Sequence, residues 1–301
     1  MQYIGIDIGG TNTKIGFFNN NLELFKKIII DTQKYSEELL LEIAKIVNEN
    51  NINNEYEGIG ITVPGFIKKD GFISEMPNIN IKDININQIM KEYTNLNTIG
   101  INDGNAAAIA EIYNSKLNKN NNYLIITIGT GLGGAIVINN KVILGNRGMS
   151  SEIGHLKIDE KYNFLCGCGK RGCAETIVSL KGIKNLINYY QKEYPYSKLN
   201  CDNINGFLYY NALSENDALA NKIMEIQSHY LSKLIDNVNT IIDLDQVIVG
   251  GGLANKTMLN NTIANYLKIS LVQYHNLEIR LTKNKNDSGM IGAVYNYIEN
   301  N

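Results

Sequence analysis

Residues 2–18 read QYIGIDIGGTNTKIGFF, and this stretch decides the fold. Apolar residues recur over 2–8 and again over 13–18, which predicts two strands. Gly9 and Gly10 interrupt them, and glycine allows both a sharp turn and a close approach to a ligand. Asp7 ends the first strand, where a buried carboxylate is costly unless a cation or hydrogen-bond donors compensate it. We therefore expect two strands joined by a glycine turn, with a carboxylate beside that turn.

The same unit recurs in the second half of the chain. Residues 123–128 and 135–138 predict strands on either side of GTGLGG at 129–134. Strands and helices alternate after each of the two units, which predicts two α/β lobes with a cleft between them. The other strands expected are 24–30, 58–63, 97–101, 246–250 and 277–282, and the helices start at Ser36 or cover 106–113, about 216–238, about 257–270 and the residues after Ser288.

The composition excludes several classes of protein. The 301 residues are 44% hydrophobic and 19% charged, with a formal net charge of −2, so nothing favours binding to nucleic acid or to an anionic membrane. The N-terminus lacks a basic signal-like segment, and no run of about eighteen apolar residues occurs. We expect a soluble cytoplasmic protein that binds neither nucleic acid nor membrane.

Three of the four cysteines and one histidine lie within 19 residues, as His155, Cys166, Cys168 and Cys173. Imidazole and thiolate are zinc ligands, and four of them close a tetrahedral structural site. Their clustering argues for reduced thiolates on a metal and against disulfides. The sequence predicts a structural zinc site within the loop 152–175.

A carboxylate stands at each end of this loop. Glu152 precedes the histidine by three residues, and Glu175 follows the last cysteine by two. A metal that fixes the loop would also fix these two acceptors for polar groups of a ligand. We expect a binding site for a molecule rich in hydroxyl groups.

The two glycine turns are candidate phosphate sites. Backbone amides exposed in such loops form an anion cradle, and a Mg²⁺ that accompanies nucleotide phosphates would compensate Asp7. One GTGLGG between strands is more often a plain hairpin, but two matched loops favour a phosphate site. A third glycine run, 250–252, follows a strand and precedes a helix, where it is equally a simple connecting turn.

Asp103 is the candidate acid–base residue. It follows the strand 97–101 and precedes an alanine-rich helix, and ligands bind at the carboxyl ends of strands in α/β folds. The alternative role is a helix N-cap. Because residues 102–105 read NDGN, another residue can cap the helix while Asp103 stays free.

These segments in this order resemble the ROK family of sugar kinases and repressors, from Tyr3 to about Tyr295. The similar motifs are DIGGTNTK, ITVPGF, MPNI, INDGNAAAIAE, IGTGLGG, SSEIGH, CGCGKRGCAE and VIVGGGLA. The resemblance implies an α/β actin-like ATPase (ribonuclease H-like) fold with two lobes around a central cleft, and a homodimer. We place the smaller lobe at 1–115, with the helix at about 288–301 packing back onto it, and the larger lobe at 116–287.

The resemblance also implies a role for each matched residue. Asp103 is the base that takes the proton from a sugar hydroxyl, which then attacks the γ-phosphorus of ATP. The sugar is bound by Gly65, Asn78, Asn102, Asp103, Glu152, His155 and Glu175. ATP and Mg²⁺ are bound by Asp7, Gly9, Gly10, Thr11, Lys14, Thr130, Gly131, Gly133, Gly250, Gly251 and Gly252. Zinc is held by His155, Cys166, Cys168 and Cys173.

The exact sugar stays open. VPG, E-x-G-H and GCAE look most like glucokinases, so we expect phosphorylation of the 6-hydroxyl of a hexose or N-acylhexosamine, with glucose modestly preferred. N-acetylmannosamine kinases and N-acetylglucosamine kinases share nearly all of these residues. Phe66 stands where glucokinases often have a small residue or proline.

A sugar-sensing repressor of the family would carry an extra N-terminal DNA-binding domain, for which we expect no room because the first strand starts at residue 3. An actin-like ATPase or chaperone would lack the cysteine loop.

Overall fold

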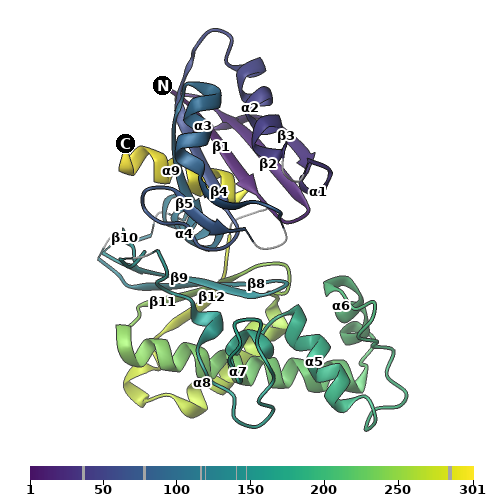
Figure 1. The fold of residues 1–301 in the computed structure, drawn as a ribbon. Coiled ribbons are helices and arrows are strands. Elements are labelled where there is room, and N and C mark those ends of the chain that lie inside the picture. The colour runs from purple at the N-terminus through teal and green to yellow at the C-terminus, as the bar shows by residue number, and fades with distance from the viewer. Residues whose placement is uncertain are drawn as a thin grey trace. The chain divides into compact units, whose positions relative to one another are not determined.

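The computed structural model describes residues 1–35, 38–76, 79–115, 117–118, 120–139, 141–146, 148–283 and 287–301. The chain forms two compact units (Figure 1). Unit 1 contains Met1–Leu117, Leu144–Ser150 and Lys283–Asn301, and unit 2 contains Asn118–Ile143 and Ser151–Thr282. Each unit combines a five-stranded sheet with helices.

The sheet of unit 1 has the strand order β3-β2-β1-β4-β7. β1 pairs antiparallel with β2 and parallel with β4, which in turn pairs parallel with β7. The first three strands therefore form an antiparallel meander. The bounds are β1 Gln2–Ile8, β2 Asn12–Phe18, β3 Leu24–Asp31, β4 Tyr56–Val63 and β7 Asn97–Asn102. A small separate sheet pairs β5 Phe72–Glu75 with β6 Lys82–Asn85.

The strand β1 shows how the two faces of this sheet are covered. Ile4, Ile6 and Ile8 point to one face, in a core shared with apolar residues of α2 and α3. Gly5 points to the other face, against α9, the yellow C-terminal helix in Figure 1. The close approach of α9 explains a second glycine: a Cβ at Gly60 of β4 would lie 2.0 Å from the Ala293 carbonyl oxygen. The helices are α1 Thr32–Tyr35, α2 Leu39–Asn50, α3 Ile86–Thr94, α4 Asp103–Asn114 and α9 Ser288–Asn300.

Unit 2 repeats the arrangement with the strand order β10-β9-β8-β11-β12. β8 is antiparallel to β9 and parallel to β11, and β11 is parallel to β12. The strands are β8 Tyr123–Ile128, β9 Leu132–Ile138, β10 Lys141–Val142, β11 Gln246–Gly250 and β12 Glu278–Leu281. The helices are α5 Leu180–Tyr190, α6 Gly206–Ser214, α7 Ala218–Ile242 and α8 Lys256–Ile269, with short 3₁₀ turns η2 Ile153–His155, η3 Ala174–Thr176 and η4 Val272–Tyr274.

The long amphipathic helix α7 forms the centre of the unit 2 core. Its buried side chains include Ile223, Leu231 and Leu234, and they share one apolar cluster with β8 and β11. Among the residues that the structure describes, no helix is both long enough and apolar enough to cross a membrane.

One of the predicted strands starts earlier than expected, and the predicted start of one helix cannot be compared. β9 begins at Leu132, so Gly133 and Gly134 belong to the strand and the second glycine turn is shorter than predicted. α2 begins at Leu39, and Ser36, the expected first residue of this helix, lies outside the described residues.

Candidate active site and metal site

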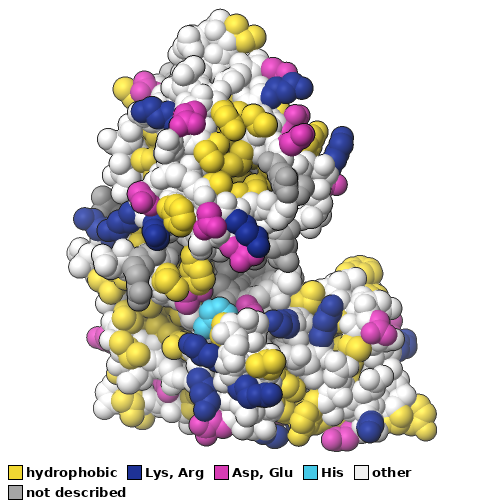
Figure 2. Space-filling model, viewed as in Figure 1, with side chains coloured by type: hydrophobic (Ala, Val, Ile, Leu, Met, Phe, Trp, Pro, Cys, Tyr) yellow, Lys and Arg dark blue, Asp and Glu magenta, His cyan; other side chains and the backbone are white. Residues whose placement is uncertain are grey.

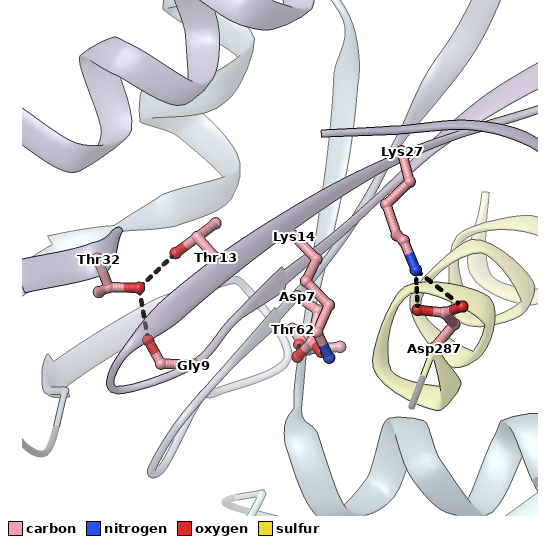
Figure 3. A network of polar contacts seen from close by, with 8 residues as sticks. All are labelled: Asp7, Gly9, Thr13, Lys14, Lys27, Thr32, Thr62 and Asp287. Atoms are coloured by element: carbon pink, nitrogen blue, oxygen red, sulfur yellow. Dashed lines mark hydrogen bonds and ion pairs between the residues drawn. The ribbon is translucent and has the colours of Figure 1, made fainter. Parts of the chain in front are cut away.

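The carboxylate of Asp7 is held in place at the end of β1. The register of β1 with β2 puts Asp7 opposite Lys14, whose Nζ lies 3.3 Å from Oδ2 (Figure 3). The buried Thr62 donates its hydroxyl to Oδ1 at 2.9 Å. The Asp7 side chain is 19% exposed, so these two donors compensate a largely desolvated charge. Asp7 therefore has the partners that the sequence analysis required of it.

The first turn of α9 lies against the same carboxylate. A Cβ at Gly289 would come within 2.5 Å of the Asp7 carboxyl carbon. The positive end of the helix dipole favours a negative charge at this position. Asp287, which precedes the helix, is fixed to β3 by an ion pair with Lys27 of 3.0 Å (Figure 3). The C-terminal helix thus contributes to the electrostatics around Asp7.

The first glycine turn is tied down by its neighbours β3 and α1. Thr32 donates its hydroxyl to the Gly9 carbonyl at 2.7 Å, and its oxygen lies 2.9 Å from the Thr13 hydroxyl (Figure 3). Gln33 donates its side-chain amide to the Gly10 carbonyl at 2.7 Å. A Cβ at Gly10 would meet nothing within 4 Å, so the space beside this residue is open. The turn is therefore fixed in shape and accessible to a ligand.

The helix α4 begins directly after β7 and carries the candidate base. The side-chain oxygen of Asn102 accepts hydrogen bonds from the amides of Gly104 and Asn105, so Asn102 is the N-cap. Its amide nitrogen donates to the Gly65 carbonyl at 2.9 Å, which leaves one N–H of that group for a ligand. Asn78, the other predicted residue of this wall, lies outside the described residues.

Asp103 is the first residue of α4 and remains exposed. The cap of the helix is Asn102, not Asp103. Desolvation by the protein atoms around it raises the pKa of its carboxyl group, and the negative charge of Asp7 raises this pKa further. The amide of Gly104, 2.8 Å away, opposes the shift. The residue is thus surrounded by protein on several sides while a path to solvent stays open. A carboxylate with a raised pKa is better suited to take a proton than an ordinary surface aspartate.

The second glycine turn, Gly129–Thr130–Gly131, lies against the start of α5. The amide of Leu180 donates to the Gly129 carbonyl at 2.9 Å, and that of Lys181 donates to the Thr130 carbonyl at 3.4 Å. Gly134 has a different purpose, because a Cβ there would lie 2.3 Å from the side chain of Ile153. Thr130 and Gly131 therefore occupy the turn, whereas Gly133 lies in β9 opposite Thr127.

Glu175 is found at this second turn. Its Oε2 accepts a hydrogen bond from the Leu132 amide at 3.3 Å, and its Oε1 lies 3.9 Å from Nζ of Lys181. A Cβ at Gly131 would come within 2.5 Å of Oε2, so the carboxylate rests directly on the glycine. Glu152, at the other end of the loop, immediately precedes the 3₁₀ turn that carries His155.

The structure brings the four predicted metal ligands together. Their ligand atoms all lie within 4.8 Å of one another. The sulfurs of Cys168 and Cys173 are 3.7 Å apart, and Nδ1 of His155 is 3.6 Å from the sulfur of Cys166. Four ligands at about 2.3 Å from a central ion would be separated by about 3.8 Å. The spacing therefore suits a tetrahedral metal site.

The chemistry of these thiols also suits a cation. Cys166 and Cys173 are buried, and burial together with the neighbouring sulfurs raises the pKa of Cys173 to about 12. Such a thiol ionises only with a positive charge beside it, which a divalent metal ion supplies. We conclude that the residues present fit a bound metal.

The loop that carries the cysteines is stiff. Gly172 adopts φ +77°, and a Cβ there would lie 2.1 Å from the Asp159 carbonyl oxygen. The buried carboxylate of Asp159 accepts hydrogen bonds from three backbone amides of 161–163 and from the Tyr230 hydroxyl of α7 at 2.7 Å. The loop is therefore anchored to the core of unit 2 independently of the metal.

The third glycine run closes the end of β11. Gly251 adopts φ +94°, and the amide of Leu253 donates to the Ile128 carbonyl at 3.0 Å. A Cβ at Gly252 would meet nothing within 4 Å. The turn thus joins the ends of β8 and β11 and leaves Gly252 open to a ligand.

The predicted residues divide between the two units. Unit 1 contains Asp7, the first glycine turn, Lys14, Gly65, Asn102 and Asp103, and the remaining described ones belong to unit 2. Thr62, Thr32 and Lys181 were not predicted from the sequence. The sequence signal for Thr62 was its position near the end of a strand, like that of Asp7 in the first strand. Lys181 stands six residues after Glu175, in the first turn of a helix that the sequence analysis did not predict.

Comparison with known proteins agrees with the fold. The chain resembles the ROK hexokinase of Thermus thermophilus, with a TM-score of 0.84, 24% identity and full coverage of both chains. It also resembles a ROK glucokinase from Streptomyces griseus, with a TM-score of 0.81, 23% identity and 98% coverage of both. The α/β class and the actin-like ATPase fold predicted from the sequence are thereby confirmed.

Sequence comparison gives the family. The glucokinase of Halalkalibacterium halodurans is 32% identical over 97% of this chain and 93% of its own length. The N-acetyl-D-glucosamine kinase of Histophilus somni is 30% identical over 96% of each chain. The model of the ROK family matches residues 3–299. Since that match spans nearly every residue, the chain belongs to the ROK family.

Proposed function

We propose that this protein transfers the γ-phosphoryl group of ATP to the 6-hydroxyl of a hexose or N-acylhexosamine, with glucose modestly preferred. The broader class, an ATP-dependent sugar kinase, follows from the family and from relatives named glucokinase and N-acetyl-D-glucosamine kinase. The observation that supports base-assisted transfer to a sugar hydroxyl is Asp103, an exposed carboxyl with a raised pKa in the first turn of α4. Ligands of open α/β sheets bind at this edge.

Asp103 takes the proton of the sugar hydroxyl in this proposal. The hydroxyl oxygen then forms a bond to the γ-phosphorus as the bond from that phosphorus to the β-bridging oxygen breaks, and ADP leaves. Such a transfer depends on positioning and charge neutralisation more than on covalent chemistry. General-base assistance of this kind contributes about 10²–10⁴-fold to the rate.

Mg²⁺ that arrives with ATP would supply charge neutralisation at the phosphates, and Asp7 is the carboxylate that fits it. The carboxylate oxygens of Asp7 are oriented by Thr62 and Lys14, so their position is fixed before the nucleotide binds. The phosphate contacts are assigned to Gly9, Gly10, Thr11, Lys14, Thr130, Gly131 and Gly133, and the adenosine end to Gly250, Gly251 and Gly252.

The sugar hydroxyls are assigned to Asn102, Glu152, His155 and Glu175, with Gly65 and Asn78 on the opposite wall. Nδ1 of His155 faces the sulfur of Cys166, so Nε2 is the ring nitrogen available to the sugar. A metal on Nδ1 would fix the orientation of the ring, and a sugar hydroxyl bonded to Nε2 would fix its tautomer, as groups bonded to metal ligands usually do. We propose zinc as this metal because three sulfurs and one imidazole are a typical structural zinc set.

The relatives do not agree on one sugar. Besides glucokinases and N-acetyl-D-glucosamine kinases they include an N-acetylmannosamine kinase from Yersinia pestis, 27% identical over 71% of this chain. The alternatives to glucose are therefore N-acetylmannosamine, in a kinase of sialic acid catabolism, and N-acetylglucosamine. A panel of these three sugars with fructose and allose, each with Mg²⁺ and ATP, distinguishes them by the rate of ADP release. Failure of every sugar to accept phosphate contradicts the proposed reaction.

A sugar-sensing regulator without kinase activity is the remote alternative. A ROK-family transcriptional regulator has a similar fold, with a TM-score of 0.84, and this chain covers 76% of it. Sugar-stimulated ADP release separates the two functions, because a pure sensor would bind sugar without turnover. We further propose a cytoplasmic homodimer, which light scattering of the purified protein tests.

A further inference from the structure

The second glycine turn lacks a positive charge of its own. Its sequence, GTGLGG at 129–134, contains no basic residue. If this turn binds nucleotide phosphates, as the proposed function holds, nearby residues have to supply cations for the phosphate charge. On the face of unit 2 in view in Figure 2, dark-blue Lys and Arg side chains are frequent. One of these basic side chains has to lie near the turn.

Lys181 is attached to the turn by its own backbone. Its amide donates to the Thr130 carbonyl at 3.4 Å, and the adjacent Leu180 amide donates to the Gly129 carbonyl at 2.9 Å. The side chain runs back toward the cysteine loop, where a Cβ at Gly167 would lie 3.3 Å from Nζ. The ammonium group is therefore held within one side-chain length of the turn.

A carboxylate already lies on the turn beside this ammonium. Oε2 of Glu175 accepts the Leu132 amide at 3.3 Å and would lie 2.5 Å from a Cβ at Gly131. Its Oε1 is 3.9 Å from Nζ of Lys181. One anionic group is thus bound between a backbone amide, a bare glycine and a lysine, which are the groups that bind a phosphate oxygen.

This pair is easy to separate. The Lys181 side chain is 44% exposed and that of Glu175 is 20% exposed. An ion pair with this solvent access contributes little to stability, so it is readily broken. A nucleotide phosphate carries more charge than one carboxylate and more acceptor oxygens, so it competes effectively for the same ammonium group.

We propose that Lys181 binds a phosphate group of the nucleotide, and that Glu175 occupies the position of that phosphate while the nucleotide is absent. Nucleotide binding then transfers Lys181 from Glu175 to the phosphate and displaces the Glu175 carboxylate from Gly131. The displaced carboxylate is the one assigned to a sugar hydroxyl. The exchange makes the sugar bind more tightly when the nucleotide is bound, and by linkage the nucleotide more tightly when the sugar is bound.

The test compares Lys181→Met with Lys184→Met in the full-length protein. Lys184 is an exposed lysine of the same helix, so both variants lose one positive charge from α5. Calorimetric titration without sugar measures the affinity for ADP and for adenosine. Lys181→Met is expected to weaken ADP binding about tenfold, since it removes a charge-assisted bond to a phosphate oxygen. It should leave adenosine binding unchanged, and Lys184→Met should change neither.

The titration of Lys181→Met can also contradict the inference. If Lys181 only positions Glu175, Lys181→Met will raise the KM for sugar and leave the ADP affinity as it is, and the inference is then wrong. A wild-type protein that binds no adenosine nucleotide at all would instead contradict the proposed function. Should Lys181→Met fold poorly, Lys181→Gln replaces it, and Lys181→Arg should retain most of the ADP affinity.

Glu175→Gln gives an independent check. This variant removes the competing negative charge, so ADP should bind several-fold more tightly than to the wild type in the absence of sugar. The same titration with and without sugar should also show that the linkage between the two ligands is lost. Unchanged or weaker ADP binding by Glu175→Gln would overturn the exchange of partners proposed for Lys181.

Discussion

Asp7 and Asp103 lie at or just after the ends of strands in unit 1, and their side chains have different partners. Asp7 has a hydroxyl donor and an ammonium group within 3.3 Å, which hold its carboxylate in place. Desolvation acts most strongly on Asp103 and raises its pKa; the Gly104 amide opposes this shift, and the charge of Asp7 adds to it. This contrast assigns cation binding to Asp7 and proton transfer to Asp103.

We expect Asp103→Asn to reduce turnover by orders of magnitude, because asparagine cannot accept the hydroxyl proton. ADP affinity, measured by titration, should stay near the wild-type value. Asp202→Asn, an exposed aspartate of unit 2, is the control and should keep full turnover. Near-normal turnover of Asp103→Asn would exclude it as the base.

The same variant gives a stability signature. A carboxyl whose pKa is raised by folding contributes stability that is complete below its unfolded pKa and is lost as the pH rises through the folded pKa. Where the pH is above the folded pKa of Asp103, this stability is absent. Asp103→Asn should therefore gain stability relative to the wild type as the pH rises through that pKa, and kcat/KM of the wild type should fall as acid protonates Asp103.

Thr62→Val tests the support of Asp7. The substitution keeps the buried shape and removes the donor to Oδ1, which leaves a largely buried acceptor without that bond at a cost of about 1–3 kcal/mol. We expect a lower free energy of unfolding and a higher Mg²⁺ concentration for half-maximal activity. Thr98→Val, a buried hydroxyl elsewhere in unit 1, should cost stability and leave the Mg²⁺ requirement unchanged.

At the scale of elements, long apolar strands and helices are predictable from the sequence, and contacts between them are not. Strands such as 58–63 and 123–128 are found with little change because most of their residues are apolar or glycine. The glycine turn at 129–134 was predicted too long. Gly134 looks like a turn residue in the sequence, but tertiary packing of Ile153 against β9 is what requires it.

The helices α3, α5 and α6 were missed for a related reason. Each is short, and the N-caps are Asn85, Ser179 and Asn205. A polar residue signals a helix start only when the residues after it are known to be helical. The ligand spacing of His155 and the cysteines was predictable because metal ligands repeat a recognisable pattern. The position of Glu175 beside Gly131 was not, because it depends on how α5 packs against the turn.

Cys168→Ser tests the cysteine loop as an element. Loss of one of four ligands should reduce the bound zinc, measured by mass spectrometry of the purified protein, from about one ion per chain to near zero. The melting temperature and the sugar affinity should fall together, since the loop carries His155 between Glu152 and Glu175. Cys201→Ser removes the cysteine outside the cluster and should alter neither quantity. Full zinc content in Cys168→Ser would contradict the ligand assignment.

At the scale of the whole molecule, the chain builds unit 1 from segments at both of its ends. α9, residues 288–300, packs against β1, β4 and α4, which lie more than 170 residues before it in the sequence. The two units have separate apolar cores, one around β1 and α2 and the other around β8 and α7. A defect in the packing of α9 should therefore weaken unit 1 selectively.

Gly292→Ala creates such a defect. A Cβ at Gly292 would lie 1.8 Å from the Ala106 carbonyl oxygen of α4, so the two helices have to move apart. Overpacking costs about 1–3 kcal/mol, which exceeds the gain of about 1 kcal/mol from better helix propensity when the clash is with backbone. In hydrogen exchange, amides of β1 and β4 should lose protection while those of β8 and β11 keep theirs. Ile298→Ala, an exposed site on the same helix, should leave both sets protected. Equal loss of protection in both units would show that they unfold together, and that α9 stabilises the molecule as a whole instead of unit 1 alone.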